Sequence, residues 1–183
     1  MSDVFTTWSI LYVGIVTVSV TAPAYKMLNI GQVAFWFGFI GYFSLLPIIC
    51  YRVFKLKNIP EPLTPMLIVF SAPISLLLAG YMSSFTEKNI FIIYLLVIIS
   101  MGFYLYSMIM MTKLLKLKFY PTISAFTFPL VISATALKLF TAFIGKQGGN
   151  TSILLIVVKI EEIIALVIVL YVLVRYLKFI LKK

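Results

Sequence analysis

The sequence predicts an all-α membrane protein in which six transmembrane helices pair as three antiparallel hairpins, within a single domain over residues 1–183. Composition is the first reason, because 63% of the residues are hydrophobic and 11% are charged, whereas a soluble domain carries about 25% charged residues. So few polar side chains cannot cover a globule, and the surface must therefore face lipid. The other two reasons are long apolar runs and basic residues in the gaps between them.

Six apolar runs are long enough to cross a bilayer, since about 20 helical residues span about 30 Å of hydrocarbon. They occupy approximately residues 4–24, 30–54, 63–83, 89–113, 119–143 and 152–178. Tilting of a helix accommodates the extra length of the longer runs. The gaps are short, so successive helices are expected to run antiparallel as hairpins.

Basic residues mark one side of these spans. Ten of the fifteen lie at or just beyond the C-terminal end of the second, fourth or sixth run: Arg52, Lys55, Lys57, Lys113, Lys116, Lys118, Arg175, Lys178, Lys182 and Lys183. Because basic loops stay on the cytoplasmic side, both termini are predicted to be cytoplasmic, in a multi-pass protein of the cell membrane. Topology thus explains the net charge of +10, and no nucleic-acid partner is expected.

The runs alternate in character along the chain. The first, third and fifth hold sixteen Ser and Thr residues, whereas the second, fourth and sixth hold five. Hydroxyls, and carbonyls freed by proline, need partners that lipid does not provide. The odd helices are therefore predicted to form an inner layer, which the even helices sheathe against lipid. The alternative is that Ser and Thr only let helices pack closely.

Two stretches of the chain repeat each other 56 residues apart. One runs from Pro65 to Pro73 and the other from Pro121 to Pro129, and each places Phe and then Ser or Thr ahead of its second proline. Pro73 and Pro129 are predicted to kink their helices. Because pores and transporters are commonly built from duplicated, kinked membrane helices, the repeat favours transport.

The fifth run carries a polar stripe beside a bulky aromatic residue. The stripe recurs at helical spacing and so lies on one face; it consists of Ser124, Thr127, Val131, Thr135 and Lys138. Phe128 borders this face directly before Pro129 and is predicted to be a hydrophobic gate; the alternative is ordinary helix packing. The residues predicted to line the pore are Ser71, Ser75, Ser124, Thr127 and Thr135.

Charged residues within the runs are few. Lys138 is expected near the outer end of its helix, either to draw anions to the pore mouth or to anchor the helix at the interface. Lys159, Glu161 and Glu162 form a cluster in the sixth run. Counted outward from Arg175 at about 1.5 Å per residue, this cluster is also expected near the outer interface, as an ion pair or as a proton or ion relay.

The sequence gives no support for an enzyme. It contains no histidine and one cysteine, Cys50. Neither a glycine-rich phosphate loop nor a deep pair of carboxylates is present. No cofactor and no metal site are therefore expected.

The stretch from Pro121 to Lys138, PTISAFTFPLVISATALK, resembles the ninth helix of the tellurite-resistance/dicarboxylate transporter family, which is similar to the slow-type anion channels. Supporting resemblances are TPMLIVFSAPISLLLAGY (64–81) to the seventh helix, VLYVLVRYL (169–177) to the tenth and WSILYVGIVTVSVTAP (8–23) to the fifth. The resemblance implies a fold of five hairpins around a pore that a phenylalanine, here Phe128, occludes. It also implies passage of anions or small acids such as C4-dicarboxylate, tellurite or inorganic anions, no covalent cofactor, and assembly as a trimer.

The chain matches only the last three of those five hairpins. It is therefore expected to be a partial or split member of the family that associates with a missing N-terminal half or with further copies, because polar inner faces left open to lipid are costly. The alternative is a fragment or scaffold that does not transport and that binds another membrane chain.

The predicted orientation can be tested by cysteine labelling in intact cells. With Cys50 replaced by serine, cysteine at Lys55 or Lys116 should not react with an impermeant maleimide added outside, because both positions are predicted to be cytoplasmic. Lys146→Cys, on the predicted opposite side, should react. Efficient labelling at Lys55 or Lys116 would reverse the orientation.

Overall fold

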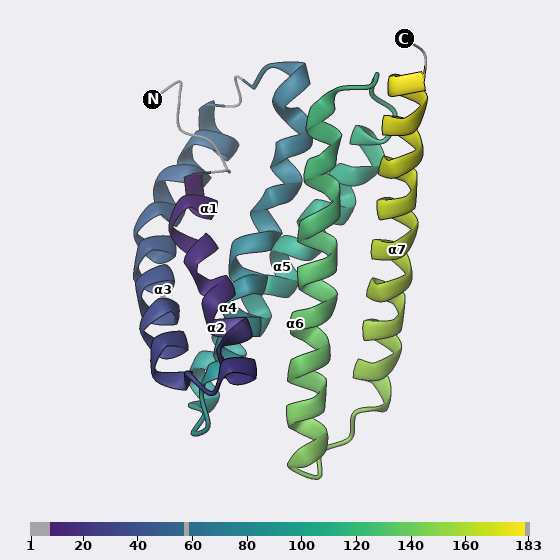
Figure 1. Ribbon diagram of the computed structural model, residues 1–183. Helices are drawn as coiled ribbons and strands as arrows, with labels where there is room; N and C mark the ends of the chain where they lie inside the picture. Colours follow the sequence, from purple (N-terminus) through teal and green to yellow (C-terminus); the bar gives the residue numbers. More distant parts are fainter. Residues whose placement is uncertain (1–7, 57–58, 182–183) are drawn as a thin grey trace.

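The structure, a computed structural model, describes residues 8–56 and 59–181 (Figure 1). Helices dominate these residues and no strand occurs among them, which confirms the all-α class. Five helical stretches of the described chain are long and apolar enough to cross a membrane: Trp8–Tyr25, Leu28–Val53, Glu61–Ser84, Ile90–Leu114 and Pro121–Lys146. They overlap the first five predicted spans.

The sixth predicted span coincides with α7 (Ser152–Leu181), a helix of 30 residues. It carries Lys159, Glu161 and Glu162 in its first half and is not among the five apolar stretches. Since 30 helical residues measure about 45 Å, α7 is long enough to span a bilayer. That it does so stays a prediction.

The odd spans mix two kinds of helical winding, whereas the even spans are long α-helices. The first span comprises α1 (Trp8–Val13), the 3₁₀ segment η1 (Gly14–Val16), α2 (Thr17–Thr21) and the 3₁₀ segment η2 (Ala22–Tyr25). The third comprises the 3₁₀ segment η4 (Glu61–Phe70) and α4 (Ser71–Ser84), and the fifth the 3₁₀ segment η5 (Pro121–Phe126) and α6 (Thr127–Lys146). The even spans are α3 (Leu28–Cys50), extended by the π turn η3 (Tyr51–Leu56), then α5 (Ile90–Leu114) and α7.

The repeated prolines mark the change of winding. Pro73 and Pro129 are each the third residue of an α-helix that follows a 3₁₀ segment. The first turn of an α-helix has backbone N–H groups without intrahelical α-type partners, so a proline there costs no α-helical bond. A bend of the helix axis at these two prolines stays a prediction.

Burial places the third span at the centre. Its most apolar window is 83% buried and that of the fifth span 50%, whereas the first, second and fourth are each 28% buried. α4 is packed by the first span and by α3, α5 and α6, so nearly every α4 residue is buried. The third and fifth spans are thus inner elements. The first is as exposed as the second and fourth because, among the described residues, it packs mainly against α3 and the third span.

Small residues let the first three spans approach closely. A Cβ added at Gly38 of α3 would overlap Cγ2 of Val16, and one at Gly80 of α4 would lie 2.6 Å from Cγ1 of the same valine. Hydroxyl groups reinforce this contact. The Ser84 hydroxyl donates to the backbone carbonyl of Ser19, and the Ser19 hydroxyl donates to the backbone carbonyl of Gly31 at 2.6 Å. Part of the hydroxyl content of the odd spans therefore serves helix packing.

The turns between spans alternate between the two ends of the bundle (Figure 1). Basic residues Arg52, Lys55, Lys113, Lys116, Lys118, Arg175 and Lys178 gather at one end, whereas Lys57, Lys182 and Lys183 lie outside the described residues. At that end Arg175 donates to the Tyr171 hydroxyl at 2.7 Å and to the Leu117 carbonyl at 3.3 Å. These seven basic residues therefore share one end of the fold, while the assignment of that end to the cytoplasm stays a prediction.

The close packing around Val16 makes a stability prediction. Gly38→Ala and Gly80→Ala should each lower the free energy of unfolding by about 1–3 kcal/mol, because the added methyl collides with Val16. Unfolding in mixed detergent micelles would measure the effect. Val16→Ala should restore part of the loss in the Gly80→Ala background.

Gly102→Ala on α5 is the matched control, since a Cβ there meets nothing within 4 Å. It should be neutral or stabilising by up to about 1 kcal/mol, as expected where alanine replaces a helical glycine. Equal effects at all three glycines would contradict the packing argument.

Candidate functional site

One face of the bundle carries two adjoining hollows built from the three odd spans. The larger, about 220 Å³, is lined by Ile10, Met66, Val69, Thr122, Ser124, Ala125, Phe128 and Pro129. The smaller, about 10 Å³, is lined by Ile10, Val13, Gly14, Ala72, Pro73, Leu76 and Phe128. Ile10 and Phe128 border both hollows, so together they separate one from the other.

The two phenylalanines of the fifth-span motif point in opposite directions. Phe126 is 0% exposed and belongs to the core that η5 and α6 form with α5 and α7. Phe128 is 45% exposed and faces the hollows. Within this chain Phe128 is therefore not a packed core residue, and its role as a gate stays a prediction.

The hollows lie where the odd spans change winding. Gly14 is the first residue of the 3₁₀ segment η1. Ala72 is the second residue of α4, and Phe128 is the second residue of α6. Ala72 is the repeat partner of Phe128, 56 residues earlier. A methyl group and an aromatic ring thus occupy equivalent positions of the repeat, so the small partner leaves room beside the large one.

Hydroxyls at equivalent positions of the repeat satisfy the 3₁₀ carbonyls. Ser71 donates to the carbonyl of Ile68 at 3.2 Å, and Thr127 donates to that of Ser124 at 2.9 Å. Ser124 in turn donates to the carbonyl of Pro121 at 3.1 Å. These bonds run three residues back along the chain, where a 3₁₀ turn directs its carbonyls, so they support the winding that shapes the hollows.

The structure separates the five residues predicted to line a pore. Ser71 and Ser75 are fully buried, and Ser75 shares a 2.8 Å hydrogen bond with Ser100 of α5. Among the described residues, they border none of the hollows that Phe128, Lys138 or Lys88 line. Ser124 lines the larger hollow, with Thr127 half-buried beside it, whereas Thr135 lies on another hollow towards α7. A pore-lining role stays a prediction for all five.

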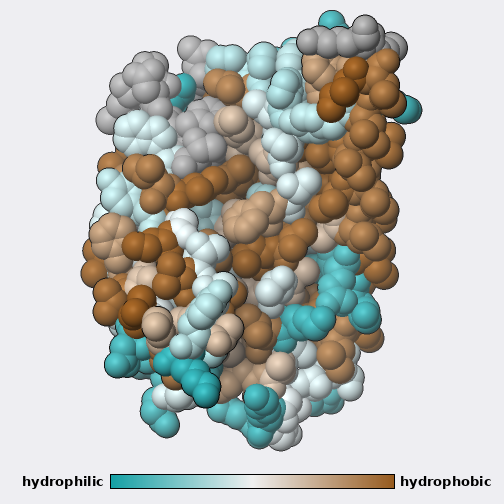
Figure 2. Space-filling model, in the orientation of Figure 1, coloured by the Kyte–Doolittle hydropathy of each residue, from teal (hydrophilic) through white to brown (hydrophobic). Residues whose placement is uncertain are grey.

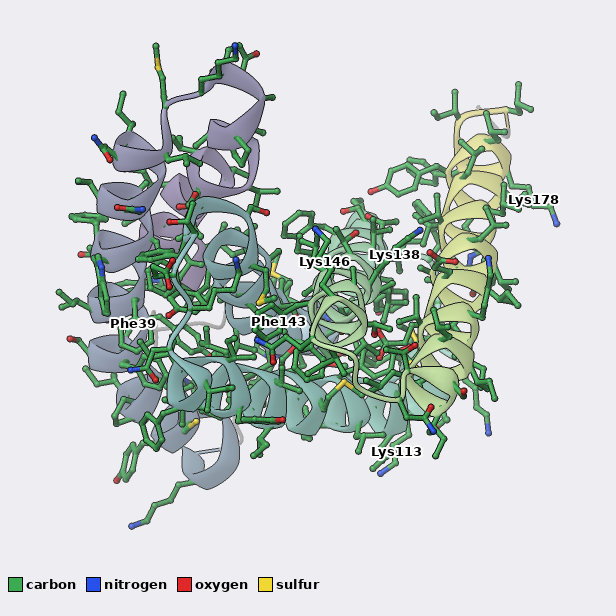
Figure 3. All side chains as sticks on the ribbon, turned by 90° about the horizontal axis from the view of Figure 1, so that it is seen from below. Phe39, Lys113, Lys138, Phe143, Lys146 and Lys178 are labelled. Atoms are coloured by element: carbon green, nitrogen blue, oxygen red, sulfur yellow. The ribbon has the colours of Figure 1, made fainter. Side chains whose placement is uncertain are left out.

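Lys138 lies in a groove between α6 and α7 (Figure 3). Its Nζ is 2.8 Å from Oε1 of Glu162, and Nζ of Lys159 is 3.2 Å from Oε2 of the same carboxylate. The expected ion pair between Lys159 and Glu162 is thus present. The pairing of Lys138 with Glu162 was not foreseen, although an acid and a base in successive antiparallel spans could have suggested it.

The groove between α6 and α7 is large and mostly apolar around these charges. It comprises hollows of about 580 and 510 Å³ that share Lys138 and Glu162. Figure 2 shows the hydrophilic patch over α6 and α7 that interrupts the apolar surface. Since Glu162 offsets part of the charge that Lys138 and Lys159 carry, the attraction of Lys138 for anions is weakened, and its role at an outer pore mouth stays a prediction.

Two further lysines, at the end opposite the basic turns, were not among the predicted site residues. Lys88 and Lys146 line a hollow of about 150 Å³ with Met82, Leu139, Ala142 and Phe143. Burial, and then the charge of Lys146, lower the pKa of Lys88, which also donates to the carbonyl of Phe85. The two cations, partly offset by the nearby carboxylate of Glu87, produce a local positive potential that attracts anions.

Fold and site together define a helical membrane protein whose duplicated inner helices surround a hollow with an exposed phenylalanine. Residues 1–177 match the model of the SLAC1 family, the voltage-dependent anion channels. The chain therefore belongs to this family, which confirms the resemblance read from the sequence and establishes an anion channel or transporter protein of the membrane. No curated protein and no solved structure matches the chain.

The separation of the predicted pore residues can be tested by cysteine accessibility. Ser124→Cys should react with a charged thiol reagent in permeabilised membranes, because its side chain borders the larger hollow. Ser75→Cys, fully buried and adjacent to Ser100, should react far more slowly. Equal reactivity at the two positions would show that the third span also faces water.

Proposed function

We propose that this chain forms part of the wall of a pore for anions or small organic acids, with Phe128 as its gate. The observation that supports this most is the exposed ring of Phe128 between two hollows that the first, third and fifth spans share. Membership of the anion-channel family supports the charge of the permeating species. C4-dicarboxylate, tellurite and inorganic anions are the proposed substrate classes.

A phenylalanine ring can close such a route without binding the solute. An apolar constriction excludes water and therefore ions, and Ile10 supplies a second apolar side chain at the same level. On one side of the ring, the larger hollow offers the hydroxyls of Thr122 and Ser124 rather than charged groups. Weak polar contacts favour conduction because a solute that binds weakly also leaves.

The wall needs further helices to become a closed pore. Phe128 and Val131 are each 45% exposed, and the groove with Lys138 and Glu162 is open at the surface. Charged side chains against lipid are costly. We propose that membrane helices of another chain or of further copies, as in a trimer, cover these surfaces, in a cell-membrane protein with both termini cytoplasmic and no enzymatic activity.

The second candidate function is a scaffold that binds another membrane chain without transport. The burial of Ser71 and Ser75 favours it, because these hydroxyls take part in helix packing rather than facing a hollow. Under this alternative, Phe128 would be a contact residue for the partner. Removing its ring would then weaken association and would not increase flux.

Phe128→Ala tests the gate in vesicles made from membranes of cells that express the whole protein. Because solutes must pass the ring, truncation should increase flux of chloride, nitrate, sulfite, malate or tellurite at unchanged protein level. Phe126→Ala is the control, since emptying a fully buried phenylalanine site should cost about 3–5 kcal/mol and reduce folded protein. Unchanged or reduced flux for Phe128→Ala with every anion would reject the gate.

A larger residue at Gly14 should have the opposite effect. A Cβ there meets nothing within 4 Å, and Gly14 borders the smaller hollow beside Phe128. In a Phe128→Ala background, Gly14→Leu should therefore fold normally and reverse the increase in anion flux. Gly102→Leu, which also has open space but lies on α5 away from the hollow, should leave the flux high.

A further inference from the structure

Three buried polar side chains from three different helices lie near one another inside the bundle. Glu161 of α7 is 1% exposed, Ser133 of α6 is 1% exposed and Tyr104 of α5 is 5% exposed. The carboxyl group of Glu161 lies beside the hydroxyl of Ser133 and close to that of Tyr104. Both Glu161 carboxylate oxygens and both hydroxyls lack a hydrogen-bond partner among the described residues.

This cluster lies deep in the bundle. Ser133 is at the middle of the span Pro121–Lys146, and Tyr104 is near the middle of Ile90–Leu114. Glu161 therefore lies level with the middle of two candidate spans, while the expected position near the outer interface stays a prediction.

The nearby positive charges are engaged elsewhere. Lys138 and Lys159 both bind Glu162, at 2.8 and 3.2 Å, in the groove on the surface. Within the described chain, the titratable group beside Glu161 is the Tyr104 phenol. An ionised carboxylate removed from water without a partner costs several kcal/mol, so the cluster requires a neutralising cation.

We propose that Glu161, Ser133 and Tyr104 form an internal site for a monovalent cation, either a proton or Na⁺. A proton on Glu161 would let the acid donate to one hydroxyl while its carbonyl oxygen accepts from the other. Na⁺ would take the same oxygen atoms as ligands, since hard cations prefer oxygen. A divalent ion fits less well because one carboxylate neutralises only half of its charge.

Infrared spectroscopy of the purified whole protein in liposomes tests the site, because the chain has only five Asp and Glu residues. In choline chloride at neutral pH, the wild type and the control Glu162→Gln should show the carbonyl band of a protonated carboxyl group. Glu161→Gln should lose this band. A band that NaCl leaves unchanged identifies the proton, and a band that NaCl removes in a saturable way identifies Na⁺.

Variants that retain Glu161 keep the test decisive if Glu161→Gln fails to fold. Ser133→Ala and Tyr104→Phe should shift the frequency of the carboxyl band, or the NaCl concentration that removes it, because each takes away one oxygen partner. A wild type with no protonated-carboxyl band and no response to Na⁺ would overturn the proposal. So would a band that persists unchanged in Glu161→Gln.

Discussion

The need to satisfy every backbone polar group inside hydrocarbon governs the odd spans. A 3₁₀ segment winds more tightly than an α-helix and has poorer hydrogen-bond geometry, so its carbonyls gain from a second donor. Ser71 and Thr127 provide that donor at equivalent positions of the repeat, and Ser107 of α5 adds a bond at 3.3 Å to the Ile68 carbonyl that Ser71 also uses. The same residues that make the odd spans polar thus permit their change of winding.

The change of winding in turn shapes the hollows. Where η4 gives way to α4 and η5 to α6, the side chains of the first α-helical turn are redirected relative to those of a continuous helix. Phe126 enters the core and Phe128 faces the hollows, because residues two apart on a helix differ by about 200° around its axis. The central helix α4 carries small residues at these contacts: Ala72 lies at the smaller hollow with the Phe128 ring, and Gly80 lies against Val16.

The α6 helix connects the proposed gate with the internal cluster. Phe128 is in its first turn and Ser133 lies further along, on the side that faces α5 and α7. An ionised Glu161 near a route for anions would repel them, since charges interact strongly in a low dielectric. A cation bound at Glu161 would remove this repulsion without placing a positive charge in the route.

The sequence alone determined the helical membrane class, five of the spans, the gathering of basic residues at one end and the family. These follow from hydropathy, from residue order and from the motif around Phe128, which do not depend on how helices rotate against each other.

Tertiary structure decided which polar residue meets which neighbour. Adjacent residues on a helix are turned by about 100°, so Glu161 points inward while Glu162 reaches Lys138 in the groove. Likewise, Ser75 and Ser124 share a residue type and a predicted role, but the packing of α5 over Ser75 buries one and leaves the other at the hollow. Periodicity defines the face on which a residue lies, and only the packing of the neighbouring helices determines whether that face is covered.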